Sequence, residues 1–262
     1  MVVFALNNGK RMKTEVSDYM RSYEAAYETH VPQGLWMTVR LDGRGFTTFT
    51  KKGDRFEKPF DIAFHEAMLA TVDSLMNCGL EIRLAHTQSD EISLVVSPDE
   101  ESFGRRVVKI LTVLAGQASA FFSSHFDEIC VFDARMLALP DSERVSQYLL
   151  WRQEDAHRNA LSAYAYWALR EEGLSARSAS KKLEGASRSQ KNELLFERGI
   201  NFNEVPEWQK RGSCVVWETF LKEGFNPKTK EVVFADRRRL VEKRHLSMKD
   251  DFRDEVEAWL RP

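Results

Sequence analysis

The sequence predicts an α+β fold, with a ferredoxin-type βαββαβ core over residues 14–140 and a helix-rich extension over residues 141–262. Three observations predict it. Short β-branched and apolar stretches alternate with longer stretches whose apolar residues recur every three or four positions. Between residues 36 and 139 the order is strand, helix, strand, strand, helix, strand, which is the split βαβ pattern. Beyond residue 140, long helical patterns dominate.

The composition is that of a soluble globular protein. Hydrophobic residues make up 43% and charged residues 30% of the 262 residues, unlike the composition of disordered chains. No apolar run is as long as a transmembrane helix, so we expect no membrane span. The three cysteines form no CxxC pair, and we expect reduced thiols in a cytoplasmic protein. A net charge of −2 argues against a nonspecific nucleic-acid coat, although 38 Lys and Arg residues allow a local basic surface.

The first elements follow from local patterns. We expect a helix over residues 14–29, where apolar and aromatic side chains share one side. Residues 36–41 read WMTVRL, a run typical of a strand, and lead directly into Asp42. Residues 61–78 carry apolar side chains at helical spacing, and Asn77-Cys78-Gly79 provides a stop.

The rest of the core is predicted as a hairpin, a helix and a strand. Two short strands over residues 80–85 and 92–97 flank a hairpin tip at residues 88–91. Residues 102–126 repeat apolar side chains three or four positions apart, which predicts a long helix facing the core. Residues 130–139 read CVFDARMLAL and are predicted as the last core strand.

The C-terminal extension is predicted to begin with helices and to end in mixed structure. Residues 142–171 form a nearly continuous helical pattern, and a further helix is expected over residues 190–198. Strand candidates lie at residues 214–220 and 231–235, and the last helix is predicted over residues 249–260.

Three carboxylates are predicted to meet at one edge of the sheet. In this topology the first and third strands are antiparallel neighbours; Asp42 closes the first strand, and Asp90 and Glu91 open the third. Converging carboxylates repel one another unless a cation lies between them, and oxygen ligands alone favour magnesium or manganese. Two such ions are a general solution for nucleotidyl transfer. The alternative is that Asp42 and Asp90 only cap turns.

A glycine-containing turn follows Asp42. The turn Gly43–Thr47 contains two glycines, so its backbone N–H groups are able to face a triphosphate. The Gly43 carbonyl is a further candidate metal ligand. The turn is not a P-loop, because the GxxxxGK[ST] pattern is absent.

Basic side chains form the other candidate surfaces. Arg105 and Lys109 are four residues apart on the predicted long helix, away from its apolar side, with Arg106 at the flank; such cations suit phosphate oxygens. His157 is a candidate phosphate contact or acid-base group, or an ordinary surface histidine. Two later basic stretches with nearby tryptophans suit an RNA backbone and a stacked base, or are solvated helix faces. The stretches contain Arg177, Lys181, Lys182, Arg188 and Lys191, then Arg237, Arg238, Arg239, Lys243 and Arg244; the tryptophans are Trp208 and Trp217.

Three ordered motifs together resemble one family. Leu41–Phe46 reads LDGRGF, Ser89–Glu91 reads SDE, and Lys191–Phe196 reads KNELLF; together they resemble the tRNA-histidine guanylyltransferase family, over about residues 15–240. The chain looks closest to its guanylyltransferase-like branch of 3′–5′ RNA polymerases. The resemblance implies a polymerase-palm-like core, two Mg²⁺ ions, ATP and GTP or other nucleoside triphosphates as substrates, tRNA as partner, and a homotetramer. It also implies that ATP adenylylates the 5′-monophosphate before the incoming nucleotide's 3′-hydroxyl attacks the activated end.

The resemblance assigns roles residue by residue. Asp42, the Gly43 carbonyl and Asp90 resemble the metal ligands, with Glu91 beside them. The catalytic candidates are Asp42, Asp90, Glu91, His157 and Lys191. The nucleotide-binding candidates are Asp42, Gly43, Arg44, Gly45, Phe46, Thr47, Thr50, Phe56, Lys58, Ser89, Asp90, Arg105, Arg106, Lys109, Asn159 and Asn192.

One stretch departs from the family pattern and affects the substrate prediction. Where the guanylyltransferase branch has His-Ile-Asn-Asn-Leu-Tyr-Asn, residues 157–163 read HRNALSA. The loss of the second Asn, the Tyr and the last Asn favours templated repair of tRNA 5′ ends. The alternative is addition of one extra G to histidine tRNA. A nucleotide cyclase, a forward polymerase and a non-catalytic RNA-binding module are less favoured, because the KNELLF motif, the basic C-terminal half and all three carboxylates are present.

Overall fold

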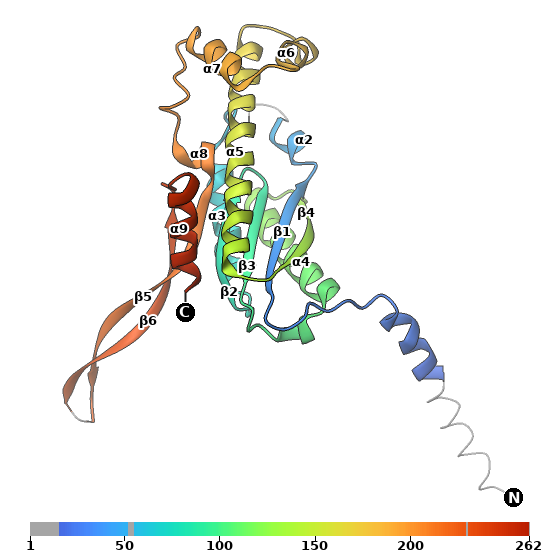
Figure 1. The fold of residues 1–262 in the computed structure, drawn as a ribbon, viewed down its shortest axis with the longest axis vertical. Helices are drawn as coiled ribbons and strands as arrows, with labels where there is room; N and C mark the ends of the chain where they lie inside the picture. The colour runs from blue at the N-terminus through green and yellow to red at the C-terminus, as the bar shows by residue number, and fades with distance from the viewer. Residues whose placement is uncertain (1–15, 52–54, 229, 262) are drawn as a thin grey trace, which may run out of the picture.

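The computed structural model describes residues 16–51, 55–228 and 230–261, and in this part of the chain six antiparallel strands form one sheet in the order β4-β1-β3-β2-β5-β6 (Figure 1). The strands are β1 (Trp36–Arg44), β2 (Ile82–Gln88), β3 (Glu91–Val96), β4 (Val131–Leu139), β5 (Ser213–Asn226) and β6 (Glu231–Lys243). The helices are α2 (Phe46–Lys51), α3 (Ile62–Met76), the 3₁₀ turn η1 (Ser102–Arg105), α4 (Val107–Phe126), α5 (Ser142–Glu171), α6 (Ala176–Leu183), α7 (Arg188–Phe196), α8 (Glu207–Arg211) and α9 (Lys249–Leu260).

The predicted βαββαβ order is confirmed by β1, α3, β2, β3, α4 and β4. Both faces of the sheet are covered. Helices α3 and α4 pack on one face over side chains such as Val39 and Leu94, and α5 and α9 pack on the other over Leu84 and Val95. Neighbouring residues of β3 therefore point into different cores, as the two-residue period of a strand requires. This explains why the core strands read as continuous apolar runs.

The long core helix begins later than predicted. Instead of starting at residue 102, α4 starts at Val107, because the backbone leaves the helical region at Phe103 (φ 56°) and Gly104 (φ 59°). The apolar side predicted for this helix is buried from Ile110 onward. Phe103, at the predicted start of the helix, is exposed instead. By length and composition α4 is the one helix in the described part of the chain apolar enough to cross a membrane. Its inner side packs on the sheet and on α3.

The C-terminal half adds strands to the same sheet, because β5 pairs with β2 across the predicted division at residue 140. Helices α5 and α9 have the predicted bounds. The strands β5 and β6 are much longer than the predicted 214–220 and 231–235. They pair with each other from Cys214 and Lys243 out to the turn, and form a two-stranded ribbon that projects beyond the sheet (Figure 1). Backbone pairing between β5 and β6 holds this ribbon together, and a local sequence pattern does not reveal such pairing.

Residues 16–25 form a helix that projects from the body of the molecule (Figure 1). The start of the predicted 14–29 helix lies outside the described residues. The side chains predicted to share one side, Val16, Tyr19, Met20 and Tyr23, are all more than half exposed. This helix therefore has an apolar side that is not covered by another element of the described chain.

Candidate functional site

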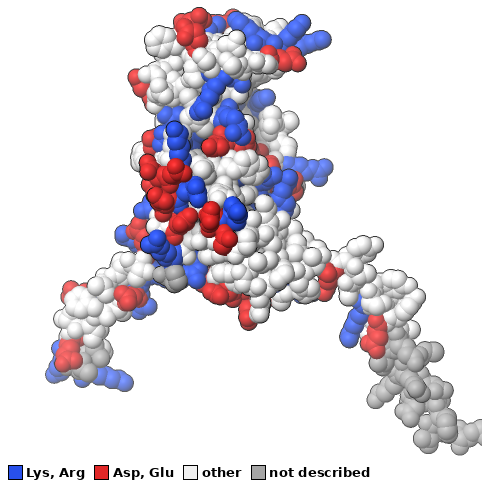
Figure 2. All heavy atoms as spheres, in the orientation of Figure 1, with Lys and Arg blue, Asp and Glu red and all other residues white. Residues whose placement is uncertain are grey.

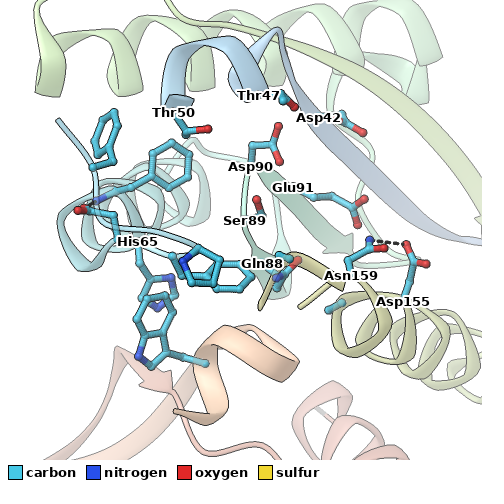
Figure 3. Close-up of a pocket in the computed structure, with 18 of the residues that line it drawn as sticks. Asp42, Thr47, Thr50, His65, Gln88, Ser89, Asp90, Glu91, Asp155 and Asn159 are labelled. Atoms are coloured by element: carbon cyan, nitrogen blue, oxygen red, sulfur yellow. Dashed lines mark hydrogen bonds between the residues drawn. The ribbon is translucent and has the colours of Figure 1, made fainter. Parts of the chain in front are cut away.

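The three predicted carboxylates lie together at the end of β1. Asp42 is directly opposite Glu91 in the β1–β3 register, and the Gly43 amide donates to the Asp90 carbonyl at 3.0 Å. Ser89, with φ of 54°, makes the tight turn that places Asp90 between β2 and β3. These residues border a cavity of about 690 Å³ that also contacts α2, α5 and α8 (Figure 3). The topological prediction that residues 48 positions apart meet here is confirmed.

Asp90 lacks a cationic partner, whereas Glu91 has one. Burial raises the pKa of Asp90 to about 6, and the neighbouring charges of Asp42 and Glu91 add to the shift. Glu91 accepts two hydrogen bonds from Arg152, 2.6 Å from Nε to Oε1 and 2.7 Å from Nη2 to Oε2. Burial still raises the pKa of Glu91, although Arg152 opposes the shift. Asp42 and Asp90 form no ion pair with a described residue, so negative charge accumulates between them.

The oxygen atoms near Asp42 fit a divalent cation. No group of three His, Cys, Asp or Glu side chains among the described residues is arranged as a metal site, and both Glu91 oxygens accept hydrogen bonds from Arg152. The available donors are the Asp42 and Asp90 carboxylates and the Gly43 carbonyl. The Phe132 amide opposite Gly43 donates to Ser119 at 2.9 Å and so does not occupy that carbonyl. An all-oxygen donor set beside a carboxyl with a raised pKa suits Mg²⁺.

The nucleotide-binding candidates divide into two groups. Thr47, Thr50, Phe56, Lys58 and Ser89 line the carboxylate cavity with Asp42 and Asp90. Residues 43–46 of the predicted turn do not line it, and β1 continues to Arg44, where it pairs with β4. Phe46 is 2% exposed and packs against the rings of Phe122 and Phe132, so its side chain belongs to the core. Arg44, Gly45 and Phe46 border a separate shallow depression. Only Asp42 and Thr47 of residues 42–47 reach the carboxylate cavity.

Further aromatic rings form a wall of the cavity, and of these only Trp208 was predicted from the sequence, as a candidate for a stacked base. His65 stacks on Trp208 with ring centroids 4.3 Å apart, and Phe60 meets the edge of the same indole. Burial lowers the pKa of His65 to about 4, so the imidazole is neutral. Trp151 and Trp167 also line the cavity. These residues come from three distant segments, residues 60–65, helix α5 and helix α8, and no local motif links them.

Helix α5 separates two cavities. Its residues Arg152, Asp155, Asn159 and Ala163 face the carboxylate cavity, where Asn159 lies 3.5 Å from the Asp155 carboxylate (Figure 3). The other side of α5 borders a second cavity of about 450 Å³. The lining of this second cavity includes His157, Arg158, Ser162, Arg188, Lys191, Arg211 and Lys249.

The structure therefore places the five catalytic candidates in two cavities. Asp42, Asp90 and Glu91 share the first, while His157 and Lys191 face the second. Lys191 donates to Ser162 at 3.0 Å. Burial, with the charges of nearby arginines, lowers the pKa of His157 to about 4, and its Nδ1 has no hydrogen-bond partner among the described residues. Asn192 borders neither cavity and donates to the Arg188 carbonyl.

The three basic candidates of residues 105–109 lie away from the carboxylates. Arg105 is 4% exposed and lies in η1, so the prediction that it shares an outer helix face with Lys109 is wrong. Its guanidinium donates to the carbonyl oxygens of Val31, Leu35, Pro98 and Glu100. Arg106 pairs with Glu28 at 2.9 Å, and Lys109 lies over the Phe103 ring.

This arrangement corrects the phosphate assignment of Arg105. Two of the carbonyls that it binds, those of Val31 and Leu35, precede β1, and the other two, of Pro98 and Glu100, follow β3. The strand β1 separates the first two from Asp42 by about 20 Å at 3.3 Å per residue. Four of the five N–H groups of a guanidinium are used. Arg105 therefore supports the chain entering β1 and does not face the cavity at the other end of the strand.

A buried histidine predicts how stability depends on pH. Burial lowers the pKa of His86, whose Nε2 lies 2.8 Å from the Arg211 carbonyl, to about 4. Unfolded chains protonate histidine at about 6.5, so the unfolded state binds more protons between these values and stability falls as pH decreases through this window. We expect His86→Gln to lose less stability than the wild type between pH 7 and 4.5, by about 2 kcal/mol. Urea unfolding of both proteins at the two pH values measures this difference, and equal losses would contradict it.

Both the sequence and the fold of this chain are similar to those of known proteins. The sequence profile described as tRNAHis guanylyltransferase matches residues 17–140, and the profile of the Thg1 C terminal domain matches residues 143–256. The tRNA(His) guanylyltransferase of Schizosaccharomyces pombe is 34% identical over 244 residues, which cover 89% of this chain and 92% of the relative. A bacterial tRNA(His) guanylyltransferase (Thg1)-like protein, solved in complex with GTP, matches with a TM-score of 0.70 and 29% identity, covering 94% of this chain and 99% of the other. A complex of such a bacterial protein with ATP matches with a TM-score of 0.72 and 28% identity over the same shares.

Proposed function

Because this chain belongs to the tRNAHis guanylyltransferase family of nucleotidyltransferases, we propose that it adds nucleotides in the 3′–5′ direction to the 5′ end of tRNA, each selected by pairing with the opposing strand. The observation that carries the proposal is the pair Asp42 and Asp90, which has no ion-pair partner among the described residues and borders a cavity large enough for a nucleotide. Templated addition would make the protein a tRNA 5′-end repair enzyme.

The residues of the cavity suit a two-step transfer. In the first step, a 5′-phosphate oxygen of the tRNA attacks the α-phosphorus of ATP and releases pyrophosphate. In the second, the 3′-hydroxyl of the incoming nucleotide attacks the activated 5′-phosphorus and releases AMP. Asp42, Asp90 and the Gly43 carbonyl would hold two Mg²⁺ ions, whose chemistry is to neutralise charge on attacking and leaving oxygens. Thr47, Thr50 and other cavity side chains would bind and orient the nucleoside triphosphates.

The altered stretch after His157 supports selection by a template. Of the three positions that lose an Asn or Tyr of the family pattern, Ala160 is fully buried in a core, and Ser162 accepts from Lys191 on the second cavity. Ala163 lines the carboxylate cavity. A methyl group forms no hydrogen bond that a wrong nucleotide would leave unpaired, so this position contributes little discrimination. The opposing RNA strand is the remaining source of discrimination between nucleotides.

The test uses a tRNA that lacks its first 5′ nucleotide. Changing the opposing 3′ base from C to A is expected to switch the preferred addition from G to U, measured as kcat/KM for each nucleoside triphosphate. Addition of G whichever base stands opposite would contradict templating and favour the alternative, extension of histidine tRNA by one G.

Other surfaces support the remaining parts of the proposal. Figure 2 shows basic side chains projecting over α6, which carries Arg177, Lys181 and Lys182, and we propose that they contact the tRNA backbone. We propose a homotetramer, in which exposed apolar side chains of the β5–β6 ribbon and of residues 16–25 contact neighbouring subunits. A cytoplasmic location is supported by three cysteines that are all described and unbridged.

A further inference from the structure

An exposed indole lies beside the carboxylates on a rigid support. Trp151 of α5 is 48% exposed and lines the carboxylate cavity. The Arg152 guanidinium lies over one face of the indole, 4.5 Å from the ring centroid. Arg152 is itself held by its two hydrogen bonds to Glu91 and by a third to Asp155 at 3.0 Å. The indole therefore rests on a guanidinium that three hydrogen bonds fix in place.

Trp151 lies on the opposite side of the carboxylates from the nucleotide candidate Thr50, whereas the candidate Asn159 lies on the Trp151 side. Figure 3 shows Asp42 and Glu91 on one side of the cavity, Thr50 and His65 on the other, and Asp90 between them. The contact through Arg152 places Trp151 on the Glu91 side. The cavity thus has one aromatic surface on each side of the candidate reaction centre.

We propose that Trp151 is a stacking platform for the terminal base pair of the tRNA acceptor stem. This inference rests on the proposed function. A templated enzyme has to hold the terminal pair whichever bases it contains, because the identity of the pair changes with the RNA. Stacking on an aromatic side chain meets this need, since every base has a π-face and the interaction tolerates sequence. The incoming nucleotide then occupies the side of Thr50, across the carboxylates.

A purely structural role for Trp151 predicts different behaviour. If the indole only shields Arg152 from water, any apolar side chain of similar size would serve equally well. If it stacks on a base, an aromatic ring is required. The variants Trp151→Phe and Trp151→Leu separate these roles, because both keep apolar bulk over Arg152 and only the first keeps a ring.

The experiment follows RNA binding directly. A truncated tRNA with 2-aminopurine at its 5′-terminal nucleotide is titrated with the wild type and with the Phe, Leu and Ala variants at position 151. We expect fluorescence quenching with the wild type and Trp151→Phe, and its loss with the other two. The KM for tRNA should rise about tenfold in Trp151→Leu and Trp151→Ala, as expected for one lost base stack. The affinity for a fluorescent ATP analogue without RNA should stay unchanged.

Each alternative outcome has a defined meaning. Tyr27→Leu, at an 86% exposed aromatic residue outside both cavities, is the matched control and should behave as the wild type. Wild-type quenching and KM in Trp151→Leu would overturn the platform in favour of the structural role. A raised KM for the nucleotide with an unchanged KM for tRNA would assign Trp151 to the nucleotide and also overturn it. If the wild-type protein fails to extend the truncated tRNA, the proposed function fails instead.

Discussion

Replacing Asp42 or Asp90 with asparagine is expected to slow both adenylylation and nucleotide addition by about a thousandfold or more. Both steps develop negative charge on phosphate oxygens, and both would use the cations that these two carboxylates are proposed to hold. Binding of the tRNA should change little, because helix α6, which carries the proposed tRNA-contacting basic residues, lies well apart from β1 in Figure 1. Single-turnover assays of each step, with filter binding of labelled tRNA, measure the two effects separately.

A stability measurement distinguishes lost chemistry from lost folding. The pKa of the Asp90 carboxyl is raised to about 6, so its ionised form opposes folding above that pH when no divalent ion is bound. Asp90→Asn should therefore be more stable than the wild type at pH 8 in the presence of a chelator, by about 2 kcal/mol. Asp99→Asn, in the exposed turn after β3, is the matched control. Retention of more than about a tenth of the activity in either active-site variant would refute the two-metal assignment.

Arg105→Ala is expected to lower the free energy of unfolding by about 3 to 5 kcal/mol. The substitution leaves four carbonyl oxygens without their donor in a region where Arg105 is 4% exposed. Arg106→Ala removes an ion pair with Glu28 in which both side chains are 40% exposed, and should cost less than about 1 kcal/mol. Urea unfolding of the two variants and the wild type gives the comparison.

The opposite pattern would restore the sequence-based hypothesis. If Arg105→Ala unfolds like the wild type but raises the KM for the nucleoside triphosphate, the side chain contacts phosphate in the working enzyme. The measurement therefore distinguishes two roles for Arg105: stabilising the chain where it enters β1, or binding the phosphates of the nucleotide.

The meeting of the carboxylates was predictable, but the surroundings of the turn after Asp42 were not. Strand order alone brings Asp42 beside Glu91, because the element pattern determines which strands are neighbours. The side chain of Phe46 looked available in the sequence, yet it fills a gap between Phe122 and Phe132. Such packing depends on residues more than 70 positions away and leaves no local signal.

Two further errors have the same origin. The expected helix starts late, at Val107, because residues 103–104 leave the helical region beside Arg105, whose four carbonyl partners come together only in the folded chain. His157 and Lys191 line a different cavity from Asp42, because the two sides of α5 face two separate cavities. A family motif identifies such residues without stating which cavity they face.

The bond between Glu91 and Arg152 also links the two inherited segments of the protein. Glu91 belongs to the segment that ends at residue 140, and Arg152 to the segment that starts at residue 143. Neither segment encloses the cavity alone. Without the second segment, Glu91 would keep only the more distant Arg40, at 3.9 Å; without the first, Arg152 would lose the carboxylate that holds its guanidinium under the Trp151 indole. The cavity therefore depends on both halves of the chain at once, even though separate sequence profiles describe them.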